Sequence, residues 1–261
     1  MDVVISVLLY VVVFFLGASI GSFSLVVIRR GHSGENGSWA KGKSVCESCK
    51  KDLKWWELIP TFSFLFLGGK CSKCKSKIDP SHFFCETAVG IAYTLLFSLF
   101  ASGRIDAIQL ILMFGAHATL IALSFNDILY RTIDVIPVYV LGGTAVLYNS
   151  ITTERYYLIL VVAGLFALFG FLCSKDNFVS FGSGDIDVLI CLFALTASGF
   201  AIFDILIYAA LLGIVLSFTV LRKSDKHVPF VPCLYFGYVL YSCGISISQL
   251  VYELTTQIMQ M

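Results

Sequence analysis

Long apolar runs separated by short polar breaks make up most of the chain. Eight such runs occur, at about residues 3–28, 85–101, 107–126, 133–149, 156–173, 185–200, 201–221 and 229–252. A run of about 20 apolar residues is long enough to cross a bilayer as a helix. The pattern predicts an all-α polytopic membrane protein with about eight transmembrane helices. The first run is too long for a signal peptide and lacks a basic segment before it, so it is predicted to be a spanning helix.

One polar insertion interrupts the runs, from Arg29 to about Ser81. It begins with a stretch typical of a flexible loop, GHSGENGSWAKGKS, and continues with four cysteines in two CxxC pairs. The predicted organisation therefore has three parts: a first transmembrane helix at 1–28, a Cys-rich loop at 29–84, and a second transmembrane region at 85–261.

Composition agrees with a membrane protein, since 58% of the residues are hydrophobic and 13% are charged, whereas a soluble domain carries about 25% charged residues. The net charge of +1 argues neither for nor against a nucleic-acid partner, and none is predicted.

Eleven of the 18 lysines and arginines lie in the polar insertion. Basic residues beside spans stay on the cytoplasmic side, so the insertion is predicted to be cytoplasmic and both chain termini are predicted to lie outside.

The two CxxC pairs, Cys46 with Cys49 and Cys71 with Cys74, are separated by 21 residues. Each CxxC turn presents two sulfurs to one metal, and two turns complete the tetrahedral thiolate site that structural zinc prefers. Two redox pairs or free thiols are the alternatives, and a reducing cytosol disfavours disulfides. The apolar linker between the pairs is expected to pack under a ribbon or on the membrane surface.

Two aspartates stand at the ends of apolar runs, Asp127 in SFNDILYRTIDVIP and Asp185 in GSGDID. The predicted topology places both near the cytoplasmic interface, although they are 58 positions apart. An ionisable group beside a span is costly and is a functional candidate by default. Two carboxylates that meet share one proton and can perform aspartic-protease chemistry. Each Asp could instead cap a helix, and Asp134 or Asp187 could be a member of the pair.

These residues together resemble the type IV prepilin peptidase family, the bifunctional leader peptidase/N-methyltransferases of type IV pili, type II secretion and competence systems. The similar segments are GSFSLVVIRR at 21–30, the cysteine region with WWELIP and GGKCSKC, Glu86 in FFCETAVG, Asp127, and the GxGD of 182–185. The small residues of GSFS are also expected to permit close helix packing, with Arg29 and Arg30 as anchors at the inner interface.

The resemblance implies a multi-pass protein of the bacterial inner membrane with Asp127 and Asp185 as catalytic residues. It implies cleavage of the short basic leader of type IV prepilins or pseudopilins at the cytoplasmic face, by an aspartic-dyad mechanism. It also implies methylation of the new N-terminal residue with S-adenosylmethionine as the donor. Structural Zn²⁺ on the four cysteines and membrane lipids complete the expected partners.

Three positions depart from the family pattern. Leu25 stands where the family has Asn, Asp187 replaces a Lys, and Asp134 rather than Asp127 precedes the expected proline, Pro137. These departures concern substrate preference and methylation rather than the aspartate pair. Two other functions fit parts of the sequence: a membrane thiol oxidoreductase that uses the CxxC pairs, and a transporter with a zinc-regulated loop.

Overall fold

The computed structural model describes residues 3–32, 43–153, 157–173, 183–219, 228–243, 247–248 and 256. Within these residues every named element is a helix, and the only strand-like pairings are two isolated bridges, Val45 with Asp52 and Lys70 with Lys77. The all-α prediction is confirmed for this part of the chain. The loop at 33–42, Gly182 of the GxGD segment, and the basic residues Arg155, Lys175 and Arg222 lie outside the described residues.

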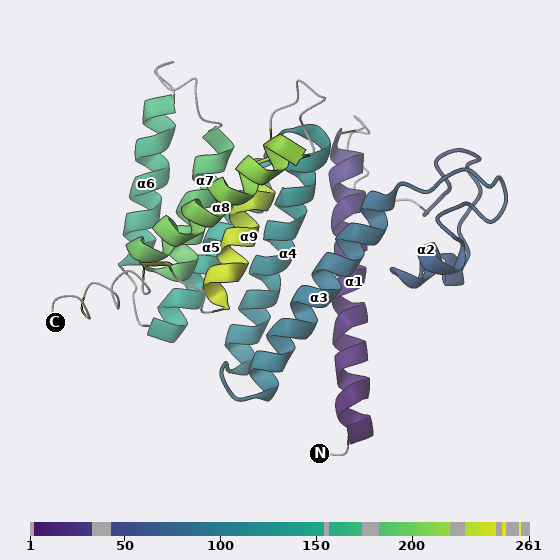
Figure 1. Cartoon of the computed structure of the whole chain (residues 1–261), viewed down its shortest axis with the longest axis horizontal. Coiled ribbons are helices and arrows are strands. Elements are labelled where there is room, and N and C mark those ends of the chain that lie inside the picture. Colours follow the sequence, from purple (N-terminus) through teal and green to yellow (C-terminus); the bar gives the residue numbers. More distant parts are fainter. Residues whose placement is uncertain are drawn as a thin grey trace. The chain divides into compact units, whose positions relative to one another are not determined.

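Eight of the helices correspond to the eight apolar runs, and two short elements lie in the polar insertion (Figure 1). The break expected at Ser198 and Gly199 is present, because α7 ends at Thr196 and α8 begins at Gly199. The elements are α1 (Val3–His32), η1 (Trp55–Leu58), α2 (Phe62–Phe66), α3 (Pro80–Ala101), α4 (Ala107–Tyr130), α5 (Val135–Thr153), α6 (Leu158–Cys173), α7 (Ser183–Thr196), α8 (Gly199–Thr219) and α9 (Val231–Ser242).

Five of the described helices are long and apolar enough to cross a membrane: α1, α3, α4, α5 and α8. Helices α6 and α9 are apolar but have shorter apolar stretches, Leu158–Leu168 and Val231–Ser242. The chain is therefore a multi-pass membrane protein, and the count of eight spans stays a prediction.

The chain divides into two compact units, Met1–Phe125 and Asn126–Met261, with the boundary inside α4. The first unit holds α1, the Cys-rich segment, α3 and α4 as far as Phe125. The second holds α5 to α9 and the last residues of α4, including Asp127. The two units do not test the three-part organisation predicted from the sequence, which stays a prediction.

In the first unit, α1 and α3 pack in antiparallel fashion along a seam of glycines. A methyl group on Gly17 would lie 2.7 Å from the carbonyl oxygen of Val89, and one on Gly21 would lie 2.9 Å from that of Cys85. On the other helix, a methyl group on Gly90 would lie 2.7 Å from the ring of Phe14. Small residues let two membrane helices approach this closely, so the expected packing role of the GSFS segment is confirmed.

In the second unit, close helix contacts again depend on glycine. A methyl group on Gly237 of α9 would lie 2.5 Å from the carbonyl oxygen of Ile205 in α8. Gly142 of α5 faces the sulfur of Cys191 in α7, at 3.3 Å from the position of a methyl group. The helices of this unit therefore pack backbone against backbone or side chain, and they set the ends of α4, α7 and α9 in fixed positions.

Candidate functional site

The four cysteines of the two CxxC pairs converge on one point. Their Sγ atoms all lie within 4.8 Å of one another, and Cys46 Sγ is 3.9 Å from Cys74 Sγ. A tetrahedral zinc–thiolate site, with Zn–S bonds of about 2.3 Å, places its sulfurs about 3.8 Å apart. The donor set therefore fits a single zinc ion. Convergence of both pairs on one point is also the arrangement of a metal site rather than of two separate redox pairs.

Each CxxC pair is built by the same backbone turn. Lys50 N–H donates to Cys46 O at 2.9 Å, and Lys75 N–H donates to Cys71 O at 3.1 Å. Lys50 and Lys75 both have left-handed backbones, with φ of 55° and 61°. This repeated turn directs two sulfurs of each segment to the same side, as two knuckles of a zinc ribbon do.

Local dipoles favour the thiolate at two of the four cysteines. The backbone N–H of Cys49 lowers the pKa of Cys46 to about 6, and the hydroxyl of Ser76 lowers the pKa of Cys74. At Cys49 the Lys51 backbone N–H acts in the same direction, but desolvation and hydrogen bonds with the neighbouring thiols outweigh it and raise the pKa to about 11. Metal ligation requires the thiolate form. The segment from 43 to 79, called the cysteine lobe from here on, thus holds two cysteines that lose their protons readily.

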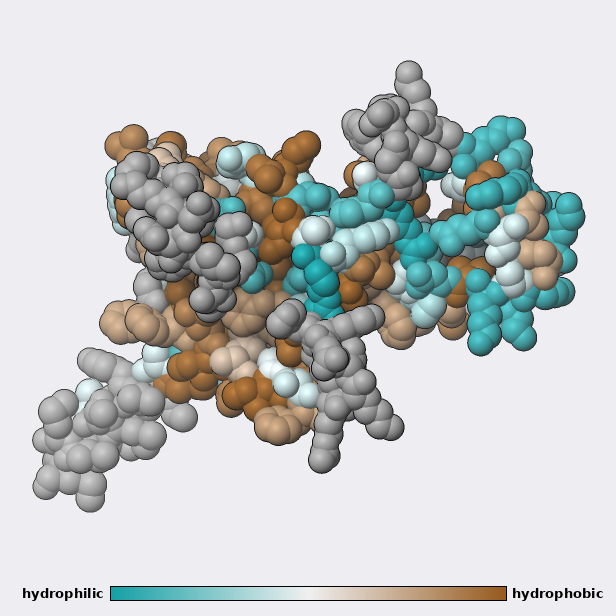
Figure 2. All heavy atoms as spheres, turned by 90° about the horizontal axis from the view of Figure 1, so that it is seen from above, coloured by the Kyte–Doolittle hydropathy of each residue, from teal (hydrophilic) through white to brown (hydrophobic). Residues whose placement is uncertain are grey.

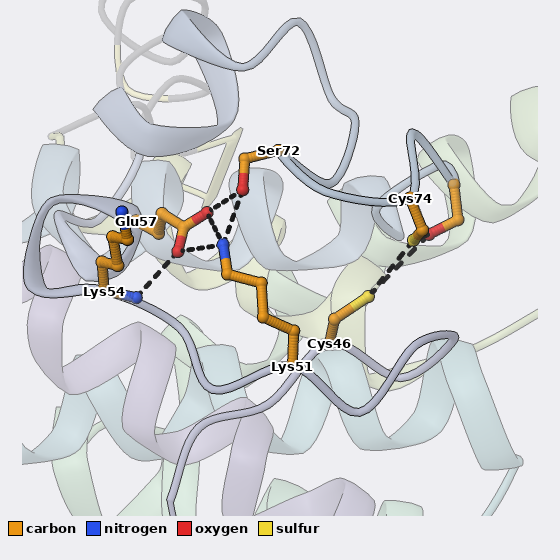
Figure 3. Close-up of polar contacts among 7 residues, drawn as sticks. Cys46, Lys51, Lys54, Glu57, Ser72 and Cys74 are labelled. Atoms are coloured by element: carbon orange, nitrogen blue, oxygen red, sulfur yellow. Dashed lines mark hydrogen bonds and ion pairs between the residues drawn. The ribbon is translucent and has the colours of Figure 1, made fainter.

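A second set of contacts joins the knuckles independently of the sulfurs (Figure 3). Lys51 Nζ, beside the first knuckle, donates to both carboxylate oxygens of Glu57 at 2.8 and 2.9 Å, and to Ser72 Oγ of the second knuckle at 2.6 Å. Ser72 and the Lys54 backbone N–H also donate to the Glu57 carboxylate. The Lys51 ammonium holds the pKa of Glu57 at about 2. Sequence reasoning missed Glu57, although it is the only acid in the apolar stretch 55–69, which was a signal.

Arg29 fastens the cysteine lobe to the end of α1. Its guanidinium contacts Glu47 of the first knuckle at 2.8 Å, Asp79 at 2.5 Å and Ser81 Oγ at 2.7 Å. Asp79 also caps α3, because its side chain accepts from Ser81 N–H and Pro80 follows it at the first helical position. The residue expected to be an interfacial anchor therefore also positions both ends of the lobe.

Glu86 lies where the cysteine lobe meets α1 and α3. It is buried, accepts from the Thr61 backbone N–H at 2.5 Å, and is hydrogen-bonded to the Ser22 side chain. Thr61 has a φ of 66°, in the left-handed region that costs a β-branched residue energy. The carboxylate thus compensates a strained turn just before α2.

Asp127, in the last turn of α4, points at the start of α9. It is only 8% exposed, and its Oδ2 accepts from the backbone N–H of Val231 at 3.1 Å; the Phe230 backbone also hydrogen-bonds to it. Carboxylates are stabilised at helix N-termini by the unpaired N–H groups there. The capping role weighed as an alternative is therefore real, but the capped helix is α9, 104 positions away.

Asp185, in the first turn of α7, is brought close enough to Asp127 for their charges to repel each other. The approach depends on Gly184, because a methyl group there would lie 2.7 Å from Ile133 Cβ in the α4–α5 connection. Asp187 instead acts electrostatically on Cys191, one turn along α7. An electrostatic interaction thus links the two aspartates chosen from the sequence, and their catalytic role stays a prediction.

Two further residues of the apolar helices, Leu25 and Asp204, are completely buried. Leu25, which replaces the family Asn, is completely buried in α1. Asp204 in α8 is also completely buried and accepts from the backbone N–H and hydroxyl of Ser248, at 2.9 and 2.8 Å. Sequence reasoning did not single out Asp204, although an acid within an apolar run was its signal.

Comparison with known proteins agrees with the resemblance. Residues 15–100 match the family model described as the bacterial peptidase A24 N-terminal domain. The prepilin leader peptidase/N-methyltransferases of Neisseria gonorrhoeae and Dichelobacter nodosus are 26% and 28% identical to the chain, over 79% of it and 73% of each relative. That of Vibrio cholerae is 26% identical over 42% of the chain and 44% of its own length. No solved structure matches. These similarities support the resemblance to the type IV prepilin peptidase family.

Proposed function

We propose that this protein removes the leader peptide of type IV prepilins or pseudopilins and methylates the new N-terminus, at the cytoplasmic face of the bacterial inner membrane. The names of its relatives support both activities. The observation that carries the peptidase proposal is the approach of two carboxylates, Asp127 and Asp185, from the ends of helices 58 positions apart in sequence.

The pair supplies an acid and a base at one place. Because like charges at short range do not both ionise readily, the pair holds one proton between them. The ionised carboxylate takes a proton from a water molecule, whose oxygen attacks the scissile carbonyl carbon. The protonated carboxyl gives its proton to the departing amine nitrogen as the C–N bond breaks. The hydrogen bond from Val231 N–H fixes the orientation of Asp127 for this exchange.

We propose that Cys46, Cys49, Cys71 and Cys74 hold one structural zinc ion. Their sulfur spacing supports this, and the metal would cross-link the two knuckles without taking part in peptide cleavage. S-adenosylmethionine is proposed as the methyl donor from the family resemblance alone, and no residue is assigned to it.

The proposal is tested by carboxamide substitutions in the two aspartates. Asp127→Asn and Asp185→Asn should each reduce leader cleavage of a co-expressed prepilin by at least about 10³-fold, because neither variant can share a proton in the pair. The protein level in the membrane should not change. N-terminal sequencing of the pilin reports cleavage and methylation together.

Matched controls lie close by in the chain. Asp134→Asn and Asp187→Asn remove the two neighbouring carboxylates that compete for membership of the pair, and both variants should keep most of the cleavage activity. Normal processing by Asp127→Asn or Asp185→Asn protein would refute the assignment. Loss of processing only in Asp134→Asn or Asp187→Asn protein would transfer the role to that residue.

A further inference from the structure

The cysteine lobe carries an apolar surface that is exposed to its surroundings. Leu58 is 46% exposed, Phe62 41%, Leu65 58% and Phe66 83%. These residues belong to η1 and α2, and together they are called the α2 apolar surface here. Figure 2 shows hydrophobic patches among the hydrophilic residues at this side of the molecule. Phe62 and Phe66 lie beside each other, with ring centroids 6.1 Å apart, and exposed apolar side chains that lie together mark an interaction surface.

The position of α2 along α1 indicates what covers this surface. Phe62 packs on Phe15 of α1, with ring centroids 5.4 Å apart, and Phe64 stacks on Phe83 of α3 at 5.2 Å. Phe15 lies about 21 Å along the helix axis from Arg29, at 1.5 Å per residue. A helix crosses the hydrocarbon core of a bilayer with about 20 residues. If that span began as early as Val3, it would still extend about 12 Å beyond Phe15 in the direction of Arg29. The part of α1 that α2 contacts is therefore inside the bilayer.

The charged residues around η1 and α2 lie where a segment embedded in the membrane requires them. Exposed Lys54 and Lys70 bracket the stretch 55–69, within which Glu57 is the only charged residue. Glu57 is buried and paired with Lys51 inside the lobe, so no unpaired charge would enter the apolar phase. Eight lysines against four carboxylates between residues 43 and 79 leave the lobe positively charged even when four thiolates hold one Zn²⁺, and this charge complements anionic headgroups.

We propose that the cysteine lobe is an interfacial membrane element whose α2 apolar surface inserts among the acyl chains of the adjacent leaflet, with the flanking Lys54 and Lys70 at the headgroups. The segment is too short to span and has the apolar side chains and flanking lysines of a monotopic anchor. Trp55, 77% exposed beside Lys54, is of the type that accumulates at the headgroup level. Thr61, fixed by Glu86, holds α2 against the two spans at this depth.

The test uses tryptophan fluorescence of the full chain in vesicles of phosphatidylcholine and phosphatidylglycerol. Trp39, Trp55 and Trp56 are replaced by Phe, and Phe66→Trp supplies a single reporter. Lipids brominated on their acyl chains should quench this reporter strongly, and aqueous acrylamide should quench it several-fold less than a control reporter. The control is Lys73→Trp, at an exposed position inside the second knuckle.

A second reporter, Leu65→Trp, gives an independent reading if Phe66→Trp protein does not fold. Acrylamide quenching at both positions equal to that at Lys73→Trp would overturn the proposal, because the surface would then face water. Low quenching by both acrylamide and brominated lipid would overturn it as well, because another protein segment would then cover the surface.

Discussion

At the scale of single residues, the two aspartates depend on neighbours that are not themselves acidic. Val231 orients Asp127 through its backbone N–H, and Gly184 permits the start of α7 to approach Ile133. Neither Val231 nor Gly184 has a side chain that could take part in the reaction. Both determine where the carboxylates lie, and the geometry of a proton-sharing pair tolerates little displacement.

Gly184→Ala should slow leader cleavage by about tenfold or more, because its methyl group would collide with Ile133 and displace Asp185. The rate of cleavage of a prepilin in proteoliposomes measures the effect. Gly143→Ala in α5 is the control, since a methyl group there meets nothing within 4 Å. Equal rates for the two variants would show that the contact with Ile133 does not position Asp185.

At the scale of elements, the cysteine lobe is held together by two independent sets of contacts. The four sulfurs form one set, and buried Glu57 with Lys51 and Ser72 forms the other (Figure 3). Arg29 and Glu86 then fix the lobe to α1 and α3. A segment of this size has too little core to fold on apolar burial alone, so these polar ties contribute to its stability, and the proposed zinc ion would add to it.

The purified protein should contain about one zinc ion per chain, and Cys71→Ser should abolish most of this content because three thiolates bind zinc less tightly than four. Elemental analysis measures it, and removal of the metal with a chelator should make the lobe thiols reactive. Cys243→Ser, which replaces an exposed cysteine outside the cluster, should retain the zinc. A metal-free protein with disulfides in both CxxC pairs would favour the thiol oxidoreductase instead.

At the scale of the whole molecule, hydrophobic patterning predicted the helices well because each apolar run is continuous along the chain. It placed the start of α3 at residue 85 rather than Pro80, since the capping signal of Asp79 and Pro80 precedes the apolar run. It did not show η1 or α2, which are only four and five residues long. Contacts such as Asp127 with Val231 join positions 104 apart and leave no local signal.

The positive-inside pattern makes a topological prediction for the chain. Ser102→Cys, at the end of α3, should be labelled in intact cells by a membrane-impermeant maleimide, because the α3–α4 turn is expected outside. Lys73→Cys in the lobe should be labelled only after permeabilisation. Mass spectrometry of the labelled peptides separates these positions from the native cysteines, and the reverse pattern would invert the predicted orientation.

The glycine seam between α1 and α3 limits how these two helices can move relative to each other. Two helices in backbone contact at Gly17 and Gly21 resist sliding past each other, because any shift of register brings side chains into the space that only hydrogen can fill. A larger side chain at Gly17 or Gly21 would therefore have to push the two helices apart along their whole contact.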